Sequence, residues 1–399
     1  MILRLEIENL SSIRDRFEVD FTLPKTTPED GRYLTVSEEH QIRVPATIAI
    51  IGANASGKTS ALRALAFVPE FVRRSFGNYR PDDHIMVDPF HTDKCRKKIS
   101  RIAIEFASQD EEFLGLVFKY ELHVQQSEDK NYVALERFSE AKIGEKYREV
   151  FLLERPTGDA VKIRASKEFN LRKGDPRRSV RQNVSLVSSL IQFGHEPSER
   201  IERLFSSSFI SNLALTKFKY PEETVNKLFY ENDGLLEELN KAIRVVDVGI
   251  ERVAMQKADG VPYPVFYHKG LDGVQTLPFE SEGTKSFYLF FPVLVYALNS
   301  GAVATIDELD SDLHPSLLNE ILRWFRDPFF NVRKGQLIFS ANSPSILHEA
   351  EKEEIWIVEK GPDGASQILP LGEMSGLRRD ANLYAKYLGG ALGGMPRFG

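Results

Sequence analysis

The 399-residue chain contains a single cysteine, Cys95, which excludes an internal disulfide and suits a reducing compartment. It has no run of eighteen apolar residues, so we expect no transmembrane helix. Near the N-terminus Arg4, Glu6 and Glu8 interrupt the apolar positions, and we therefore expect no signal peptide and a cytoplasmic protein. The net charge of −6 excludes a generally basic surface, so any nucleic-acid contact must come from a local patch.

The most informative stretch that the chain does contain is residues 48–59. Four apolar residues, 48–51, predict a buried strand that runs into G-x-x-x-x-G-K-T, and residues 60–65 continue in a helical pattern. In that context the backbone N–H groups of the loop converge on an anion at a helix N-terminus. We expect the phosphates of a nucleoside triphosphate to be held by Gly52, Asn54, Ala55, Ser56, Gly57, Lys58, Thr59 and Ser60.

Two side chains of this loop have separate roles. Lys58 is expected to reach the β- and γ-phosphates and to act in catalysis, and the Thr59 hydroxyl is expected to bind Mg²⁺. The alternative is a glycine-rich turn with an accidental Lys-Thr pair, which the flanking strand and helix disfavour. The sequence therefore predicts a protein that uses ATP and Mg²⁺.

A second buried strand, residues 301–306, ends in Asp307 and Glu308. In phosphate-loop enzymes an acid at the end of a neighbouring strand holds the Mg²⁺, and Asp307 fits that role. Glu308 can orient or deprotonate the attacking water, which makes it the expected catalytic base. Alone, the pair could equally mark a helix start, because acids favour the first turn. Together with the phosphate loop it predicts a catalytic magnesium site.

Three further features surround this strand. Ser281 and Gly283 precede an apolar helix, and a Ser-x-Gly segment at a helix N-terminus can bind an anion. Asp310 lies in a turn before Pro315, which suits the first position of a helix. A third apolar strand, residues 336–340, leads to Asn342.

The rest of the chain is less specific. Period-two patterns predict two strands within residues 1–23 and an antiparallel meander within 99–165, whereas 24–44 and 73–98 read as irregular. Residues 186–246 read as short helices, one with Asp233 as its N-cap. Between them lies a basic loop, either a nucleic-acid or acidic-partner contact or simply a solvated surface. Its charges are Arg172, Lys173, Arg177, Arg178 and Arg181.

This order of motifs resembles the ATP-binding-cassette (ABC) ATPases, and within them the SMC and RecF-like branch. It is most similar to the compact ATPases of prokaryotic abortive-infection and anti-phage operons, whose tail resembles residues 378–396 here. The resemblance covers about residues 1–70 and 240–399. It implies an α/β P-loop NTPase of the ABC-ATPase head type, with an antiparallel β subdomain and a helical insertion lobe. The implied domains are 1–165, 166–246 and 247–399.

In such heads two subunits enclose two ATP molecules. Carried across, Ser281 and Gly283 would bind the γ-phosphate held by the other subunit, and Asp310 would couple the two sites. The family usually has a histidine where this chain has Asn342, whose amide can bind a phosphate oxygen but cannot become a cation. We therefore expect slow hydrolysis. The glutamine that usually contacts Mg²⁺ has no clear counterpart, and Gln109 and Gln182 are the candidates.

The resemblance implies an ATPase that hydrolyses ATP to ADP and phosphate and acts as a clamp or sensor in phage defence. It would form homodimers or higher oligomers and hold or release an effector encoded alongside it, such as a TOPRIM or other nuclease. An Asp310/Asp312 pair mimics a nuclease motif, but it lies inside the ATPase turn. The alternatives are a RecF-like DNA-repair clamp and a scaffold that binds ATP and barely hydrolyses it.

Overall fold

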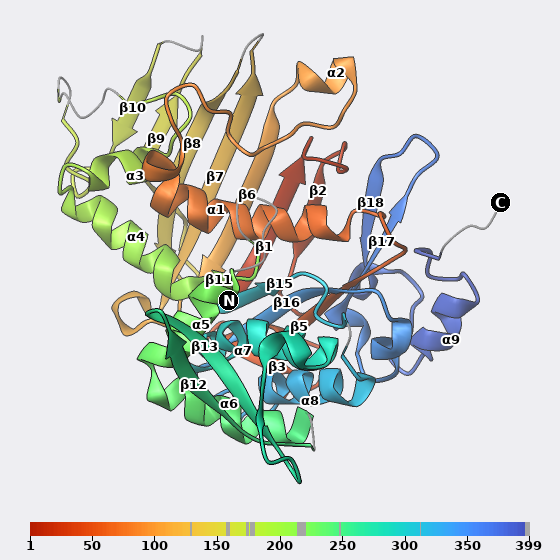
Figure 1. Cartoon of the computed structure of the whole chain (residues 1–399). Coiled ribbons are helices and arrows are strands. Elements are labelled where there is room, and N and C mark those ends of the chain that lie inside the picture. Colours follow the sequence, from red (N-terminus) through yellow and green to blue (C-terminus); the bar gives the residue numbers. More distant parts are fainter. Residues whose placement is uncertain are drawn as a thin grey trace.

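The computed structural model describes residues 1–127, 130–156, 160–172, 175, 180–213, 221–246, 249–311 and 313–395. Figure 1 shows an antiparallel sheet at the upper left, a second sheet below it, and helix α1 (Lys58–Asn78) in front of the antiparallel sheet. Within the described residues, no helix has both the length and the apolar character needed to cross a bilayer.

The lower sheet positions the phosphate loop, the pair of acids and Asn342. Its strand order is β11-β15-β16-β5-β17-β18; the first five strands are parallel and β18 is antiparallel. The strands are β11 (Phe209–Ser211), β15 (Val303–Ile306), β16 (Gln336–Ala341), β5 (Thr47–Ile51), β17 (Ile355–Lys360) and β18 (Ser366–Pro370). The three strands that the motifs predicted, β5, β15 and β16, are confirmed and adjacent. Since parallel strands end at one edge, the residues that follow them meet there.

Apolar side chains alternate between the two faces of this sheet. On β5, Ile48 and Ile50 belong to one core, which also contains α1 and the antiparallel sheet. Ala49 and Ile51 belong to the other core, formed with α7 (Glu282–Ser300) and α8 (Pro315–Arg326). Every residue of β5 is buried, as expected for a central parallel strand covered on both faces. This burial holds the phosphate loop on a rigid support.

The upper sheet is the predicted meander joined by the two N-terminal strands, and all its pairings are antiparallel. Its strands in spatial order are β10 (Lys162–Ala165), β9 (Arg148–Glu154), β8 (Asn131–Lys142), β7 (Leu116–Gln126), β6 (Ser100–Ala107), β1 (Ile2–Glu8) and β2 (Phe17–Asp20). Segments from residues 1–23 and 99–165 therefore form one sheet although the phosphate loop lies between them in sequence. The parallel sheet followed by phosphate loop and helix, plus this antiparallel part, confirms the predicted fold class.

The helices predicted within residues 186–246 do not form one lobe. Helices α3 (Leu186–Ile191) and α4 (Glu196–Ser208) pack against α1 and share the core of the antiparallel sheet. Helices α5 (Glu222–Glu231) and α6 (Asp233–Val246) join the other core and pack on the small sheet β12-β13-β14. The division follows the strand β11 between them, which the helical pattern did not predict because it has only three residues.

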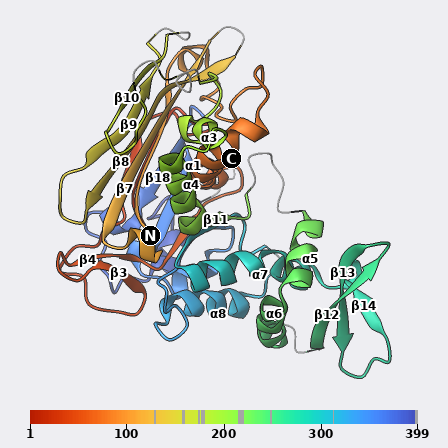
Figure 2. The same ribbon diagram turned by 90° about the vertical axis from the view of Figure 1, so that its left-hand side faces the viewer.

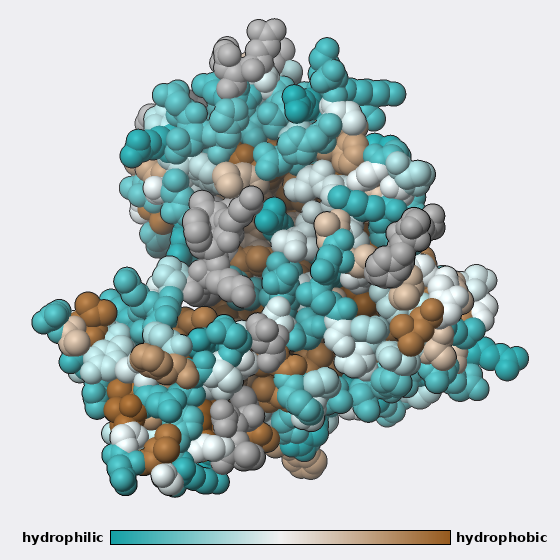
Figure 3. All heavy atoms as spheres, turned by 45° about the vertical axis from the view of Figure 1, so that its right-hand side comes forward, coloured by the Kyte–Doolittle hydropathy of each residue, from teal (hydrophilic) through white to brown (hydrophobic). Residues whose placement is uncertain are grey.

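The small sheet and its two helices project from the body (Figure 2). Its strands are β12 (Ile250–Ala258), β13 (Val261–His268) and β14 (Val274–Thr276). Figure 3 shows brown residues scattered over this lobe at the lower left. The exposed apolar residues here include Leu228, Val245, Val261, Leu271 and Val274. Isolated exposed apolar side chains are normal at a protein surface, and they are not gathered on one element.

Three other predictions were wrong. Residues 24–44 contain strand β3 (Tyr33–Ser37) and the start of β4 (Ile42–Pro45), a hairpin fixed by buried apolar residues of both strands. Residues 73–98 are not wholly irregular, since α1 continues to Asn78 and α2 (Asp93–Arg96) follows. The cap of α6 is Asn232, whose side-chain oxygen accepts the N–H of Leu235, and Asp233 is already in the first turn.

Glu136 on β8 is buried at the junction of the sheet and α3. Its carboxylate accepts hydrogen bonds from the Tyr120 and Ser185 hydroxyls and from the backbone N–H of Leu186. Burial raises the pKa of Glu136, although these donors and the charge of Arg155 oppose the rise. The Glu136 side chain therefore anchors the N-terminus of α3, while its burial favours the protonated form.

This predicts a pH-dependent stability. A carboxyl whose pKa is higher in the folded state contributes stability below its unfolded value, near 4.5, and loses it as the pH rises through the folded pKa. Replacing Glu136 by Gln removes the titration but leaves a buried donor unpaired, which costs about 1–3 kcal/mol at low pH. We expect urea unfolding to show this deficit shrinking as the pH rises. Exposed Glu38→Gln is the control, and a pH-independent difference between Glu136→Gln and wild type would contradict the assignment.

Candidate nucleotide site

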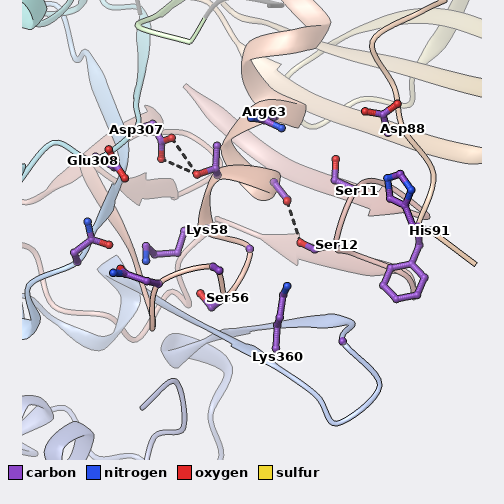
Figure 4. A pocket seen from close by; sticks show the side chains of 18 residues that line it. Ser11, Ser12, Ser56, Lys58, Arg63, Asp88, His91, Asp307, Glu308 and Lys360 are labelled. Carbon is purple, nitrogen blue, oxygen red and sulfur yellow. Dashed lines mark hydrogen bonds between the residues drawn. The ribbon is translucent and has the colours of Figure 1, made fainter. Parts of the chain in front are cut away.

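The edge where β5, β15 and β16 end opens into a cavity of about 790 Å³, which we call the loop cavity. Figure 4 shows Lys58 with Asp307 and Glu308 on one side of it, Ser11, Asp88 and His91 on the other, and Lys360 at its lower rim. The predicted residues that line it are Asn54, Ala55, Ser56, Gly57, Lys58, Thr59, Ser60, Asp307, Glu308 and Asn342. Residues separated by almost 290 positions in sequence thus surround one space.

The two glycines of the phosphate loop are required by its packing. A Cβ on Gly52 would lie 2.1 Å from the backbone oxygen of Val358 on β17, so Gly52 lets the loop start against that strand. Gly57 has φ +112°, and its Cβ would lie 2.2 Å from the Ser366 hydroxyl. The same hydroxyl donates to the carbonyl of Ser56 at 2.5 Å. Gly52 is buried below the loop and does not line the cavity, so its contribution is to the shape of the loop.

Lys58 folds back over its own loop. Its ammonium donates to the carbonyl oxygens of Gly52, at 2.9 Å, and Ala53, at 3.1 Å. Loss of solvent lowers the pKa of Lys58, while the charges of Asp310, Asp307 and Glu308 act in the opposite direction. A bound phosphate would add a further negative charge beside this desolvated ammonium and would therefore stabilise its charged form.

The two residues expected to bind magnesium are in direct contact. The Thr59 hydroxyl lies 3.0 and 3.2 Å from the two carboxylate oxygens of Asp307. Ser340 on β16 donates to the same carboxylate at 2.5 Å. Among the described residues no cluster of three or more His, Cys, Asp or Glu side chains could hold a metal. The oxygen donors present fit Mg²⁺, which is commonly bound by one or two protein groups together with phosphates and water.

Glu308 is exposed and has a strained backbone. Its φ is +55°, in the left-handed region, and its N–H donates to the Ser340 hydroxyl at 2.7 Å. Strain in a non-glycine residue persists only where neighbours impose it, and it concentrates at functional sites. Here Ser340 bonds both to the carboxylate of Asp307 and to the backbone of Glu308, so one side chain of β16 orients both acids.

Asp310 joins the aspartate turn to the segment after β16. Its carboxylate accepts the backbone N–H groups of Asn342, at 2.9 and 3.1 Å, and Ser343, at 2.6 Å. The side chain of Asn342 lines the loop cavity, whereas Asp310 is not among the residues that line it. The backbone of Asn342 is therefore held independently of its side chain.

Ser281 and Gly283 are not among the described residues that line the loop cavity of their own chain. Ser281 is exposed and caps α7, its hydroxyl accepting the N–H of Thr284 at 3.1 Å. The preceding Glu280 is buried and its carboxylate lies 2.9 Å from His268 Nε2 on β13. The start of α7 is thus a fixed, accessible helix N-terminus.

Several residues of the loop cavity carried no sequence signal. Ser12, in the turn between β1 and β2, has its hydroxyl 2.9 Å from that of Ser60, and the N–H of neighbouring Ser11 donates to the carbonyl of Asp88. The others that motifs did not indicate are Arg63, Phe90, His91, Lys360 and Gly364. Arg63 lies on α1 directly after the phosphate loop, whereas the others come from the turn between β1 and β2, an irregular segment and the β17–β18 hairpin, so only the fold brings those to the loop.

The two candidate glutamines do not line the loop cavity. Gln109 lies against Gly301, which directly precedes β15. The start of β15 is at the opposite end of the sheet from the phosphate loop. The backbone carbonyl of Gln182 accepts a hydrogen bond from the backbone N–H of Val133 on β8. Neither position supports a contact with Mg²⁺ in this chain.

Lys173, Arg177 and Arg178 of the basic loop lie outside the described residues, as does Asp312 of the aspartate turn. Arg181 is described, and its guanidinium donates to the carbonyls of Phe76 and Tyr79 while lying 4.2 Å over the Phe76 ring. Arg181 thus secures the C-terminal end of α1.

Residues 48–347, more than half of the chain, match the family described as "AAA domain, putative AbiEii toxin, Type IV TA system". The chain belongs to this family. The match includes the phosphate loop, the start of α7 and the strands that carry the two acids and Asn342. It confirms the resemblance to ABC-type AAA ATPases of abortive-infection systems that the motifs suggested.

One curated relative is the "Retron Ec83 probable ATPase" of Escherichia coli, 25% identical over 154 residues. The match covers 36% of this chain and 27% of that protein, so this chain spans only about a quarter of the relative's length. Among solved structures, the SMC head domain of Thermotoga maritima is 12% identical with a TM-score of 0.44, covering 92% of this chain and 98% of that one. An SmcHead bound to the C-winged helix domain of ScpA is 15% identical with a TM-score of 0.46, covering 92% and 97%.

Asn342→His should raise the turnover number for ATP by about tenfold, because an imidazole can carry a proton near neutral pH and an amide cannot. The backbone contact of Asn342 with Asp310 does not involve the replaced side chain. Steady-state phosphate release measures the change, and Asn342→Ala, expected to be slower than wild type, is the control. An unchanged or lower rate in Asn342→His would show that the asparagine does not limit turnover.

Proposed function

We propose that this chain is an ABC-type ATPase that binds Mg²⁺·ATP in the loop cavity and slowly hydrolyses it to ADP and phosphate. The observation that carries the proposal is the contact of the Thr59 hydroxyl with the Asp307 carboxylate beside the ammonium of Lys58. In phosphate-loop enzymes a hydroxyl and an acid in these positions hold Mg²⁺, which neutralises charge that develops on the phosphates.

The residues around that contact have distinct roles in the proposal. Lys58 exchanges its bonds to the loop carbonyls for bonds to phosphate oxygens, which are stronger acceptors because they are charged. Glu308 accepts a proton from the attacking water, and its exposed position at the cavity leaves it free to do so. Asn342 donates its amide hydrogens to the phosphate that is transferred.

Assembly of two copies completes the proposed site. The exposed N-terminus of α7 carries backbone N–H groups and the Ser281 hydroxyl, a combination that binds anions, yet it lies outside its own chain's loop cavity. We infer that Ser281 and Gly283 bind the γ-phosphate held by a second copy. Asp310, which holds the backbone after β16, would then transmit the arrival of that copy to Asn342.

In cells, the proposed ATPase acts as a sensor or clamp that holds an effector and releases it on hydrolysis. The family description, which includes a toxin, and the retron name of the relative support a role in defence against phage. The proposed effector is a nuclease, of TOPRIM or another class, encoded beside this chain. A RecF-like DNA clamp has less support, because Arg181 of the basic loop is engaged with α1.

Sedimentation of the protein with ATP and with ADP tests the proposal. We expect dimers or larger assemblies with ATP and monomers with ADP. Ser281→Arg should still bind ATP but fail to assemble, because the new side chain blocks the α7 N-terminus. Ser300→Arg, at the other end of α7, is the matched control. A monomer under all conditions, or normal assembly of Ser281→Arg, would refute the shared site.

A further inference from the structure

The segment 382–394 contacts the nucleotide site at two places. Helix α9 (Leu383–Leu388) packs against η4 (Pro344–His348), the turn that follows Asn342 and Ser343. There the rings of Tyr384 and His348 stack with centroids 4.0 Å apart. After α9, which Figure 1 shows at the right of the molecule, the chain returns to β17 and the phosphate loop.

At the phosphate loop the contact is made by the backbone of one residue, Gly394. Its carbonyl accepts the backbone N–H of Ala53 at 3.1 Å and the hydroxyl of Tyr387 at 3.1 Å. Its N–H donates to the carboxylate of Glu359 on β17 at 3.0 Å. Ala53 directly follows Gly52, and the Tyr387 side chain is buried. The start of the phosphate loop is therefore bonded to the tail, which is in turn bonded to α9 and β17.

Glycine is required where the tail reaches the loop. Gly393 and Gly394 have φ +74° and +72°, in the left-handed region. A Cβ on Gly394 would lie 2.5 Å from Cγ2 of Ile357, and one on Gly393 would lie 2.9 Å from the carboxylate of Glu359. These contacts give a physical reason for the Gly393-Gly394 pair of the tail, which no nucleotide motif accounts for.

We propose that residues 382–394 are a positioning element that holds the phosphate loop in its anion-binding shape and links it to the turn after Asn342. Tyr387 is its positioning residue, acting through Gly394 on the N–H of Ala53. The inference rests on the proposed ATP site. A loop that binds phosphate through backbone N–H groups gains affinity when those groups are held in place beforehand. Loosening the loop lowers the populated fraction of its binding shape, and the apparent affinity falls by the same factor.

Tyr387→Phe removes only the hydroxyl and tests the proposal. We expect the dissociation constant for ATP to rise about threefold to tenfold, the effect of losing one hydrogen bond. The turnover number at saturating ATP should stay unchanged, because the variant alters how often the loop is formed and not the chemistry. In the ATP-free protein, hydrogen exchange of residues 48–58 should become faster.

Tyr384→Phe is the matched control on the same helix. Its hydroxyl has no hydrogen-bond partner among the described residues, so ATP affinity and hydrogen exchange should match wild type. Gly394→Ala is a second variant, in which the added methyl group meets Ile357 and lifts the tail, and its loss of affinity should exceed that of Tyr387→Phe. Thermal unfolding and circular dichroism establish that each variant is folded.

Two outcomes separate this inference from the proposed function. If folded Tyr387→Phe binds ATP as tightly as wild type and its phosphate loop exchanges at the same rate, the tail does not position the loop and the inference is wrong. If wild type itself binds no ATP, the proposed function is wrong. Hydrogen exchange in the ATP-free proteins then still measures whether the tail holds the loop, because that readout needs no nucleotide.

Discussion

Glu308→Gln should lower ATP turnover by about 10²–10⁴-fold, the usual contribution of a general base, while ATP binding is retained. The amide has the size of the carboxylate but cannot take a proton from water. The backbone of Glu308 is held through its own N–H and the Ser340 hydroxyl, so the left-handed conformation does not depend on the replaced group. Single-turnover phosphate release and equilibrium binding of ATP measure the two effects separately.

Glu349→Gln is the control, because this exposed glutamate is not among the residues lining the loop cavity. A rate in Glu308→Gln within tenfold of wild type would assign the base to another group. The same variant distinguishes a clamp from a scaffold. If hydrolysis resets the assembly, the ATP-bound assembly of Glu308→Gln should persist longer than that of wild type, whereas equal lifetimes would favour a scaffold that barely uses hydrolysis.

Lys58→Ala should weaken ATP binding by about a hundredfold. A hydrogen bond to a charged group contributes about 1.5–3 kcal/mol, and each 1.4 kcal/mol is a factor of ten in affinity. The variant also frees the carbonyls of Gly52 and Ala53, which the ammonium now holds together. Titration calorimetry with Mg²⁺·ATP gives the dissociation constant directly.

Lys360→Ala provides a matched comparison, since it removes a lysine from the rim of the same cavity. Lys360 is exposed on β17, where solvent screens its charge, so we expect a change of less than about threefold. Equal losses in the two variants would mean that Lys58 contributes only general positive charge. A large loss confined to Lys58 would support its specific contact with the phosphates.

The features that were predicted correctly from the sequence are those whose chemistry depends on residues close together in the chain. The phosphate loop needs glycine at two fixed positions between a strand and a helix, and the packing of Gly52 against Val358 agrees with that need. The buried strand before Asp307 was visible because a central parallel strand is apolar on both faces. The α8 helix, too, begins at Pro315 as its pattern predicted.

The same reasoning failed where an element is short or stabilised from a distance. The strands β3, β4 and β11 have too few residues to display a period. The β3–β4 hairpin is held by its buried apolar residues, and β11 by its pairing with β15. The helical residues 186–246, predicted to form one insertion lobe together with the basic loop, are divided between two cores, because their pattern shows only which helix faces are apolar. The core that receives each face is a property of the whole fold.

By itself, the sequence determined that this protein has a phosphate loop, a pair of acids after a second strand, and a polar residue after a third, because each of these is a local pattern. Only the tertiary structure decided that the three strands are neighbours, that Ser340 orients both acids, and that Gly394 reaches Ala53. These contacts join residues up to about 340 positions apart, so no local pattern encodes them. The entropy lost in closing such long loops is offset by burial of apolar side chains in the two cores, which is a property of the whole fold.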